Sequence, residues 1–211
     1  MASRVAIGRW VSAGTLVLLL GALAAKPVAK ILSRSDAPPL VLAPPPNDGD
    51  ASPRIRFENG QFQQLRQGDG SAHTIRSLLR VPGRMQFGDF AWNDRDVPPG
   101  RIWLRVDLSR QILSVFRGEH EIGTSVILYG QDATPTPTGD FPIRGMEKNH
   151  RSNSYDAQMP FTLWLTGDGV AIHGSDVREG LATHGCIGVP LGFAQRLFGV
   201  VKRGDLVSVL S

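Results

Sequence analysis

Cysteine is almost absent from this chain of 211 residues, which has one, at position 186. A single cysteine cannot form a disulfide within its own chain, so a disulfide framework is excluded. Aromatic residues are also scarce, at 7% of the sequence, whereas glycine and proline number 24 and 15. This composition suits a loop-rich β or α+β domain better than a helical bundle.

Acidic residues are missing from positions 1–34, where five basic residues stand: Arg4, Arg9, Lys26, Lys30 and Arg34. The rest of the chain holds 18 basic and 19 acidic residues, so the formal net charge of +4 belongs to this N-terminal arm. A near-neutral body has no electrostatic footprint for a phosphate backbone. We therefore expect no nucleic-acid partner.

An uncharged run rich in leucine, valine and alanine extends over residues 10–25, after two arginines. A basic start, an apolar stretch and the small-residue sequence Ala22-Leu23-Ala24 are typical of a secretory signal. The run is slightly shorter than the ~20 residues that a membrane-spanning helix needs. Residues 1–25 are interpreted as either a cleaved signal peptide or a retained membrane anchor, so we expect a location in the cell envelope.

Proline marks the next segment, because residues 26–53 contain seven of them, as in an extended, semi-rigid spacer. Residues 54–100 form an N-terminal extension whose role the sequence does not indicate. Within it, Ser71 is expected to begin a short helix with Ile75, Leu78 and Leu79 on one side. Residues 101–211 are assigned to the main folded domain.

Hydrophobicity alternates with a period of two from residue 102 onward, which predicts strands. The candidate strands cover residues 102–108, 111–116, 121–128, 161–165, 170–173 and 206–210. A single helix is expected late in the domain: Pro190 opens it, Gly204 ends it, and its apolar stripe is Ala194, Leu197, Phe198 and Val201. Residues 101–211 therefore read as a mainly β domain with one late helix.

The lone cysteine lies in Ala-Thr-His-Gly-Cys-Ile-Gly, thirteen residues after a second His-Gly pair, His173-Gly174. A free cysteine has a pKa of ~8.5, so only a few per cent is thiolate at neutral pH. A histidine within hydrogen-bond reach can accept the thiol proton if a third group orients its ring. Backbone carbonyls after His173 can do this, and Gly185 permits a tight turn whose N–H groups converge on an oxyanion.

Other interpretations of this cluster stay open from the residues alone. Cys186 could be an inert, buried small hydrophobe, although an exported chain with an idle thiol risks oxidation. His173, His184 and Cys186, with Asp176, could ligate a metal, but their spacing is unfamiliar for such sites. The histidines could also be structural. Three more have no partner in sequence and are expected to be solvated: His73, His120 and His150.

Four blocks in the C-terminal half follow one another in the order of a known family. They are residues 106–111, the T-P-x-G-x-F-x-I segment at 136–143, residues 159–174 with their terminal His-Gly, and Thr183-His184-Gly185-Cys186-Ile187. Together they resemble the catalytic domain of the L,D-transpeptidases of bacterial cell walls, the YkuD-type fold. The resemblance implies a YkuD-like β-sandwich or barrel, preceded here by the hydrophobic segment and the proline-rich linker.

Carried over to this chain, the resemblance implies that Cys186 is the nucleophile and His173 the general base. The carbonyl of Gly174, or of Ser175 beside it, would orient the imidazole. The turn and the oxyanion hole would be shaped by three residues, Thr183, His184 and Gly185. No metal or organic cofactor is implied. Many members carry Arg or Asn two residues after the cysteine, where this chain has Gly188, and the loop between His173 and Thr183 is shorter than in many relatives.

The implied function is formation of cross-links between peptidoglycan stem peptides through a cysteine thioester. Two alternatives stay open: an L,D-carboxypeptidase or amidase that transfers the acyl group to water, and a non-catalytic peptidoglycan-binding module. A papain-like hydrolase is disfavoured, because those enzymes place the cysteine before the histidine. The expected partners are stem peptides and, through residues 10–25, a membrane; the sequence does not indicate an oligomeric state.

Overall fold

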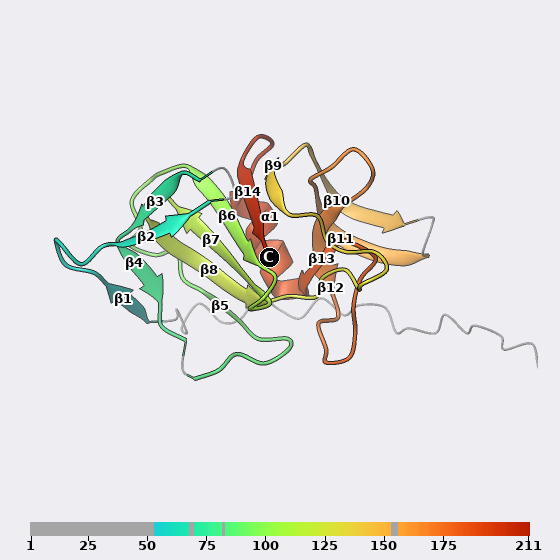
Figure 1. Ribbon diagram of the computed structural model, residues 1–211, viewed down its shortest axis with the longest axis horizontal. Helices are drawn as coiled ribbons and strands as arrows, with labels where there is room; N and C mark the ends of the chain where they lie inside the picture. The colour runs from blue at the N-terminus through green and yellow to red at the C-terminus, as the bar shows by residue number, and fades with distance from the viewer. Residues whose placement is uncertain (1–52, 68–69, 82, 153–155) are drawn as a thin grey trace, which may run out of the picture. The chain divides into compact units, whose positions relative to one another are not determined.

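The computed structural model describes residues 53–67, 70–81, 83–152 and 156–211 (Figure 1). The hydrophobic run at residues 10–25 and all of the linker except Pro53 lie outside the described residues. In the described part of the chain, no helix is both long and apolar enough to cross a bilayer.

The strands of the described residues form two sheets and a separate hairpin. The large sheet has the order β1-β4-β8-β7-β6-β14-β9, with β5 paired to β8. Its strands are β1 (Arg54–Arg56), β4 (Ser77–Leu79), β5 (Phe90–Trp92), β6 (Ile102–Asp107), β7 (Ile112–Arg117), β8 (His120–Val126), β9 (Gly139–Pro142) and β14 (Leu206–Leu210). The second sheet contains four strands, which lie side by side in chain order: β10 (Gly145–Ser152), β11 (Ala157–Trp164), β12 (Ala171–Ser175) and β13 (Ile187–Pro190). The hairpin pairs β2 (Gln63–Arg66) with β3 (Ala72–Ile75).

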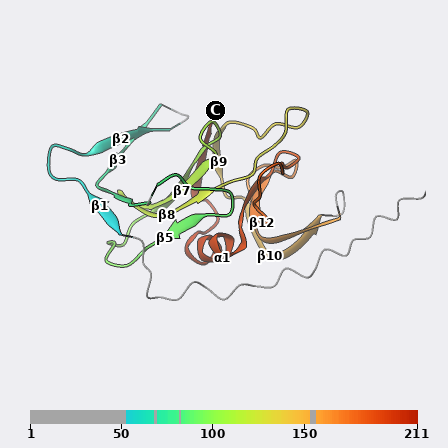
Figure 2. The ribbon, with the colours of Figure 1, turned by 90° about the horizontal axis from the view of Figure 1, so that it is seen from below.

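The helix α1 (Leu191–Val200) lies between the large sheet and the second sheet, as Figures 1 and 2 show from two sides. It starts after Pro190 and buries Phe193, Ala194 and Leu197. Two of these, Ala194 and Leu197, belong to the apolar stripe that the sequence predicts. These side chains join one core with residues from both sheets, among them Leu104, Val115, Ile122, Leu163, Ile172 and Ile187. The helix therefore fixes the second sheet against the large one.

A second, smaller apolar cluster lies on the outer face of the large sheet, and the N-terminal extension supplies part of it. Along β6, Leu104 points into the main core, whereas Trp103 joins a separate cluster with Ile75 and Phe116. The Trp103 ring stacks on Phe116 at 4.1 Å and on His73 at 4.3 Å between ring centroids. Because β1, β4 and β5 also pair within the large sheet, the extension is built into the same sheet as the domain that follows it.

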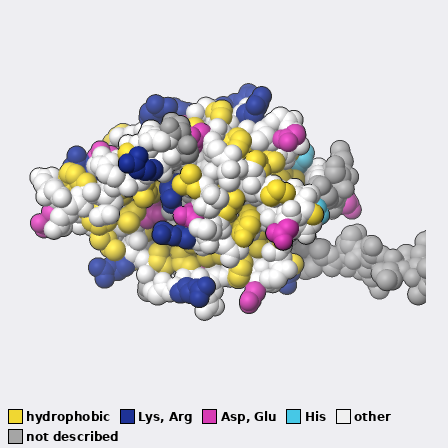
Figure 3. Space-filling model, in the orientation of Figure 1, with side chains coloured by type: hydrophobic (Ala, Val, Ile, Leu, Met, Phe, Trp, Pro, Cys, Tyr) yellow, Lys and Arg dark blue, Asp and Glu magenta, His cyan; other side chains and the backbone are white. Residues whose placement is uncertain are grey.

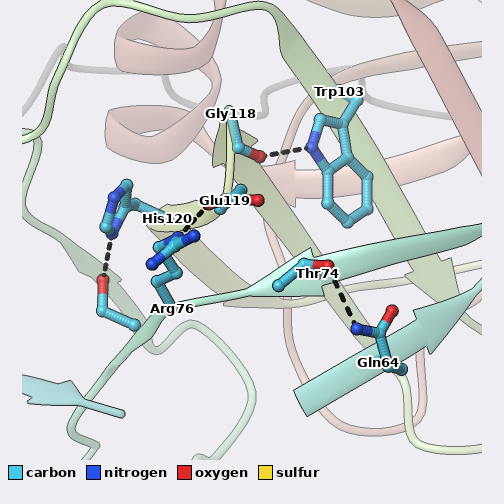
Figure 4. A network of polar contacts seen from close by, with 8 residues as sticks. Gln64, Thr74, Arg76, Trp103, Gly118, Glu119 and His120 are labelled. Atoms are coloured by element: carbon cyan, nitrogen blue, oxygen red, sulfur yellow. Dashed lines mark hydrogen bonds and ion pairs between the residues drawn. The ribbon is translucent and has the colours of Figure 1, made fainter. Parts of the chain in front are cut away.

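Polar contacts tie the extension to the turn between β7 and β8 (Figure 4). Arg76 forms an ion pair with Glu119, and the Ser77 hydroxyl lies 2.8 Å from Nδ1 of His120. Backbone pairing of Ser77 with His120 adds β4 in parallel to β8. His73 and His120 are thus engaged in packing and hydrogen bonding, so the expectation that they are simply solvated is wrong.

The expected helix after Ser71 is also wrong. Residues 72–75 and 77–79 are the strands β3 and β4, and Ile75 and Leu79 are buried. Three apolar residues at helical spacing span little more than one turn, and nucleating so short a helix is costly. Pairing with β1, β2 and β8 satisfies the same backbone groups and covers Trp103 at once.

Candidate active site

His173 lies in β12 and is 9% exposed. Its Nδ1 is 3.0 Å from the carbonyl oxygen of Gly174. A carbonyl can only accept, so Nδ1 carries the proton and Nε2 keeps a free lone pair, the form required of a base. A Cβ at Gly174 would lie 3.0 Å from side-chain atoms of both Leu191 and Pro160, which is tighter than ordinary packing contacts.

Cys186 comes one residue before β13, beside the strand that carries His173. The two strands run parallel, with Ile172 opposite Ile187 and His173 opposite Gly188. Cys186 precedes Ile187, so it leads into β13 level with Ala171, two residues before His173 on the neighbouring strand. The candidate nucleophile and the candidate base therefore lie on neighbouring segments of one sheet.

The turn that leads into Cys186 is held from both sides. The Thr183 hydroxyl donates to the carbonyl of Cys186 at 2.5 Å, and the Thr183 N–H donates to the Tyr129 carbonyl at 3.0 Å. Gly185 has φ +106°, in the region that side chains with a Cβ rarely adopt. Thr183 and Gly185 thus shape the turn, and His184 is exposed on it. The role of the turn as an oxyanion hole stays a prediction.

A second glycine, Gly130, packs closely against this turn. A Cβ on Gly130 would lie 2.9 Å from the Cα of Gly185 and 2.1 Å from the Thr134 carbonyl oxygen. The Gly130 N–H donates to the hydroxyl of Thr136 at 2.8 Å. Thr136 begins the T-P-x-G segment, so that segment positions the nucleophile turn through Gly130.

Burial keeps both reacting groups uncharged at rest. It lowers the pKa of His173, although the bond to Gly174 works against this, and it raises the pKa of the Cys186 thiol. The thiol also lies 3.7 Å from the carbonyl oxygen of Gly169. Two neutral groups of this kind suit a chemistry in which an imidazole takes the thiol proton as the sulfur attacks, rather than one that starts from a stable ion pair.

Gly188 lies two residues after Cys186, and Ser175 occupies the space beside it. A Cβ at position 188 would lie 2.9 Å from the Cβ of Ser175 and 3.2 Å from its Oγ. Glycine is therefore the residue that lets β13 pair closely with β12 next to His173. An arginine at this position would need Ser175 to move.

The metal interpretation included Asp176 with the two histidines and the cysteine. Asp176 instead forms an ion pair with Arg178 at 2.6 Å. Among residues 53–67, 70–81, 83–152 and 156–211, no three His, Cys, Asp or Glu side chains gather as metal ligands would. The loop that holds Asp176 turns Val177 into an apolar cluster with Met85 and Phe87 of the extension.

A polar cluster beside this site was missed in the sequence. Glu147, His150 and Trp164 contact one another on β10 and β11, and His150 is close enough to contribute to the lowered pKa of His173. His150 is thus not merely solvated. Its partners are three and fourteen residues away, a pattern that only the pairing of β10 with β11 reveals.

A cavity of about 1010 Å³ lies elsewhere, on the outer side of the large sheet. Its walls include Leu79 and Met85 from the extension and Arg105 from β6, whereas neither Cys186 nor His173 lines it. Basic and acidic side chains are interspersed on the face that Figure 3 shows. This cavity is therefore separate from the Cys186 turn.

Comparisons with known proteins concern the family and the fold of this domain. A family model for the L,D-transpeptidase catalytic domain (YkuD) matches residues 101–209, and no curated protein matches the chain. Similar solved structures include an L,D-transpeptidase from Stackebrandtia nassauensis, at 22% identity and a TM-score of 0.50 over 56% of this chain and 60% of that one. Another, from Mycobacterium smegmatis, has 15% identity and a TM-score of 0.51 over 80% of this chain and 88% of that one.

The chain spans less than two thirds of the length of the Stackebrandtia protein. At these identities the structural likeness concerns the fold. The predicted fold, mainly β with one late helix in the part that the structure describes, is confirmed.

Proposed function

This chain belongs to the L,D-transpeptidase family with a YkuD-type catalytic domain, and we propose that it cross-links peptidoglycan stem peptides through a thioester on Cys186. One observation supports the chemistry most: His173, with Nδ1 bonded to the Gly174 carbonyl, lies on β12 beside β13, the strand that Cys186 leads into. That arrangement joins a nucleophile, a base and a group that orients the base.

In the first half-reaction, sulfur attacks the carbonyl carbon of an L-residue while Nε2 of His173 takes the thiol proton. The tetrahedral intermediate then expels the terminal D-amino acid, and His173 returns the proton to its departing amine. A thioester on Cys186 and a free amino acid result. Dividing one difficult acyl transfer into two easier steps is what a covalent nucleophile provides.

In the second half-reaction, the amine of a neighbouring stem attacks the thioester. His173 removes a proton from that amine and delivers it to the departing sulfur, which restores the thiol. Water in place of the amine would give hydrolysis with the same residues, so the acceptor alone separates a transpeptidase from a carboxypeptidase.

The first test is the intact mass of the full chain, kept soluble in detergent, after exposure to a carbapenem. We expect one covalent adduct, and His173→Ala should form it at least ~100-fold more slowly, the usual effect of losing a general base. His73→Ala is the matched control, because His73 belongs to the extension and stacks on Trp103 of β6 rather than contributing to the candidate site. This variant should react at the normal rate. No adduct on the wild type would favour the non-catalytic binding module.

The second test is product analysis with disaccharide-tetrapeptides. Cross-linked dimers support the transpeptidase, whereas tripeptide alone would favour the hydrolytic alternative.

We also propose that the enzyme works in the periplasm, secreted or anchored through residues 10–25. The uncharged run after two arginines supports this location. Cell fractionation with N-terminal sequencing tests it: mature protein starting near residue 25 indicates cleavage, full-length protein in the membrane fraction indicates an anchor, and recovery from the cytoplasm would contradict the proposal.

A further inference from the structure

The cavity of about 1010 Å³ on the outer side of the large sheet has a polar row in its floor. Arg105 of β6 is paired with Ser114 of β7, which is paired with Thr124 of β8, so these residues form one row across three strands. All three line the cavity, as do Ile112 and Phe116, which lie two residues to either side of Ser114 along β7. A cation and two hydroxyls are therefore placed together between apolar neighbours.

The N-terminal extension supplies further walls of this cavity. Met85 and Phe87, from the segment between β4 and β5, line it and pack against the apolar cluster that contains Val126. Two side chains with amide groups, Gln86 and Gln111, line it as well. Pockets for small organic ligands measure roughly 300–1,000 Å³. Amides and hydroxyls among apolar side chains suit a short peptide better than a hydrocarbon chain, because buried peptide groups need hydrogen-bond partners.

The guanidinium of Arg105 is incompletely paired. One of its terminal nitrogens lies 3.3 Å from Oδ2 of Asp107, which is long for a hydrogen bond. Its Nε is buried and has no hydrogen-bond partner among the described residues. Arginine carries five N–H donors in a fixed fork, and a cation taken out of water is costly unless it is paired. The side chain is still 22% exposed, so an anion in the cavity can reach it.

Asp107 divides its carboxylate among several donors. Its Oδ1 accepts from the Ser109 hydroxyl at 2.7 Å and from the Arg110 N–H at 3.0 Å, and Oδ2 lies 3.9 Å from the Arg110 side chain. Burial works to raise the pKa of Asp107, but these donors outweigh it and the pKa is lowered, so Asp107 stays charged. Its charge repels a dianion such as phosphate, whereas a single carboxylate matches the fork of one arginine.

We propose that this cavity is a second binding site, separate from the Cys186 turn, for a short peptide with a free C-terminal carboxylate, which the Arg105 guanidinium binds. The hydroxyls and amides in the walls bind the peptide groups that precede the carboxylate, and the apolar side chains contact the peptide's own side chains. Two sources share this chemistry: a peptidoglycan stem peptide, which ends in a D-residue, and the C-terminus of a protein.

The test is a calorimetric titration of the full chain, kept soluble in detergent, with the tripeptide acetyl-Ala-Leu-Ala. All residues of this probe are L, so it is not a substrate for the acyl transfer proposed above. We expect saturable binding, and the same peptide with a C-terminal amide should bind at least ~10-fold more weakly, as for the loss of a hydrogen bond to a charged group. Acetate should compete with the tripeptide at lower concentrations than inorganic phosphate does.

Arg105→Lys keeps the charge but removes the fork, so binding of the free acid should weaken about five- to tenfold, and binding of the amide less than ~twofold. Arg110→Gln is the matched control. Arg110 also lines the cavity and contacts Asp107, but its side chain is 78% exposed, so the affinity should change less than ~twofold. Both variants should form the carbapenem adduct at the wild-type rate, because neither Cys186 nor His173 lines the cavity.

Three results would overturn the inference: equal binding of the acid and the amide, an equal loss in Arg110→Gln and Arg105→Lys, or phosphate competing better than acetate. The first comparison uses the wild type, so it decides the matter even if Arg105→Lys fails to fold.

Titration of Cys186→Ala with a stem tetrapeptide, with and without Arg105→Lys, identifies the source of the peptide. A larger effect of Arg105→Lys on the stem than on acetyl-Ala-Leu-Ala supports a cell-wall stem as the ligand, and a smaller effect supports a protein C-terminus. No effect on either peptide would contradict the carboxylate site.

Discussion

Gly188→Ala is the substitution whose effect the structure defines most closely. The new methyl group would lie 2.9 Å from the Cβ of Ser175, 3.2 Å from its Oγ and 3.4 Å from the Cβ of Leu128. Carbon atoms in contact normally lie about 3.5–4.0 Å apart, so either β12 or β13 must shift. The backbone bonds between Gly188 and Leu128, at 2.8 and 2.9 Å, hold β13 in place.

Overpacking of this kind costs about 1–3 kcal/mol, and we expect that loss in the free energy of unfolding measured with urea. Acylation by a carbapenem should also slow about tenfold or more, because Gly188 pairs with His173 and a small displacement of a base is expensive in rate. Ser175→Gly in the same chain removes the clash, so the double variant should regain most of both losses.

Gly199→Ala is the matched control. Gly199 lies in α1 with nothing within 4 Å of a Cβ, so alanine should stabilise the protein by about 0.5–1 kcal/mol and leave acylation unchanged. The reasoning is refuted if Gly188→Ala is neutral, or if its effects and those of Ser175→Gly simply add within about 0.5 kcal/mol.

Three further predictions concern separate parts of the structure. Gly185→Ala, at φ +106°, should lose about 1–2 kcal/mol of stability and most of the acylation rate, measured by unfolding and by adduct formation; a fully active variant would contradict the account of the turn. Burial lowers the pKa of His173, so below about pH 6.5 the unfolded chain binds more protons than the folded one, and the free energy of unfolding should decrease as the pH is lowered. Urea titrations from pH 7 to 5 should show a smaller decrease in His173→Gln. Trp103→Ala should cost about 3–5 kcal/mol in urea unfolding, because Trp103 is 4% exposed between Phe116 and His73, and a loss below 1 kcal/mol would contradict its role as the contact for the extension.

Local patterns predict much of the domain, and their failures have physical causes. Alternation along β6 and β7 and the stripe of α1 are visible because each element buries one well-defined set of residues in the main core. The extension gives no such signal. Its strands are three or four residues long and bury Ile75 and Leu79 only through partners distant in sequence.

In the candidate site, too, some features can be predicted from the sequence and others cannot. Cys186, His173 and the turn residues can be named from the sequence because the chemistry constrains their types and the motif keeps them close together. The contact between Ser175 and Gly188, the support of the turn by Gly130, and the Glu147 cluster depend on strand register. Register is set by the whole sheet, so no local pattern could have indicated them.

The central claim is that a stem-peptide acyl group is carried on Cys186. The most direct test mixes the full chain with a stem tetrapeptide, quenches with acid, and maps the added mass by peptide analysis. The account predicts an acid-stable thioester, equal in mass to the donor less its terminal D-alanine, on the peptide that contains Cys186 and absent from Cys186→Ala. An acyl group on another residue, or one that persists in Cys186→Ala, would contradict it.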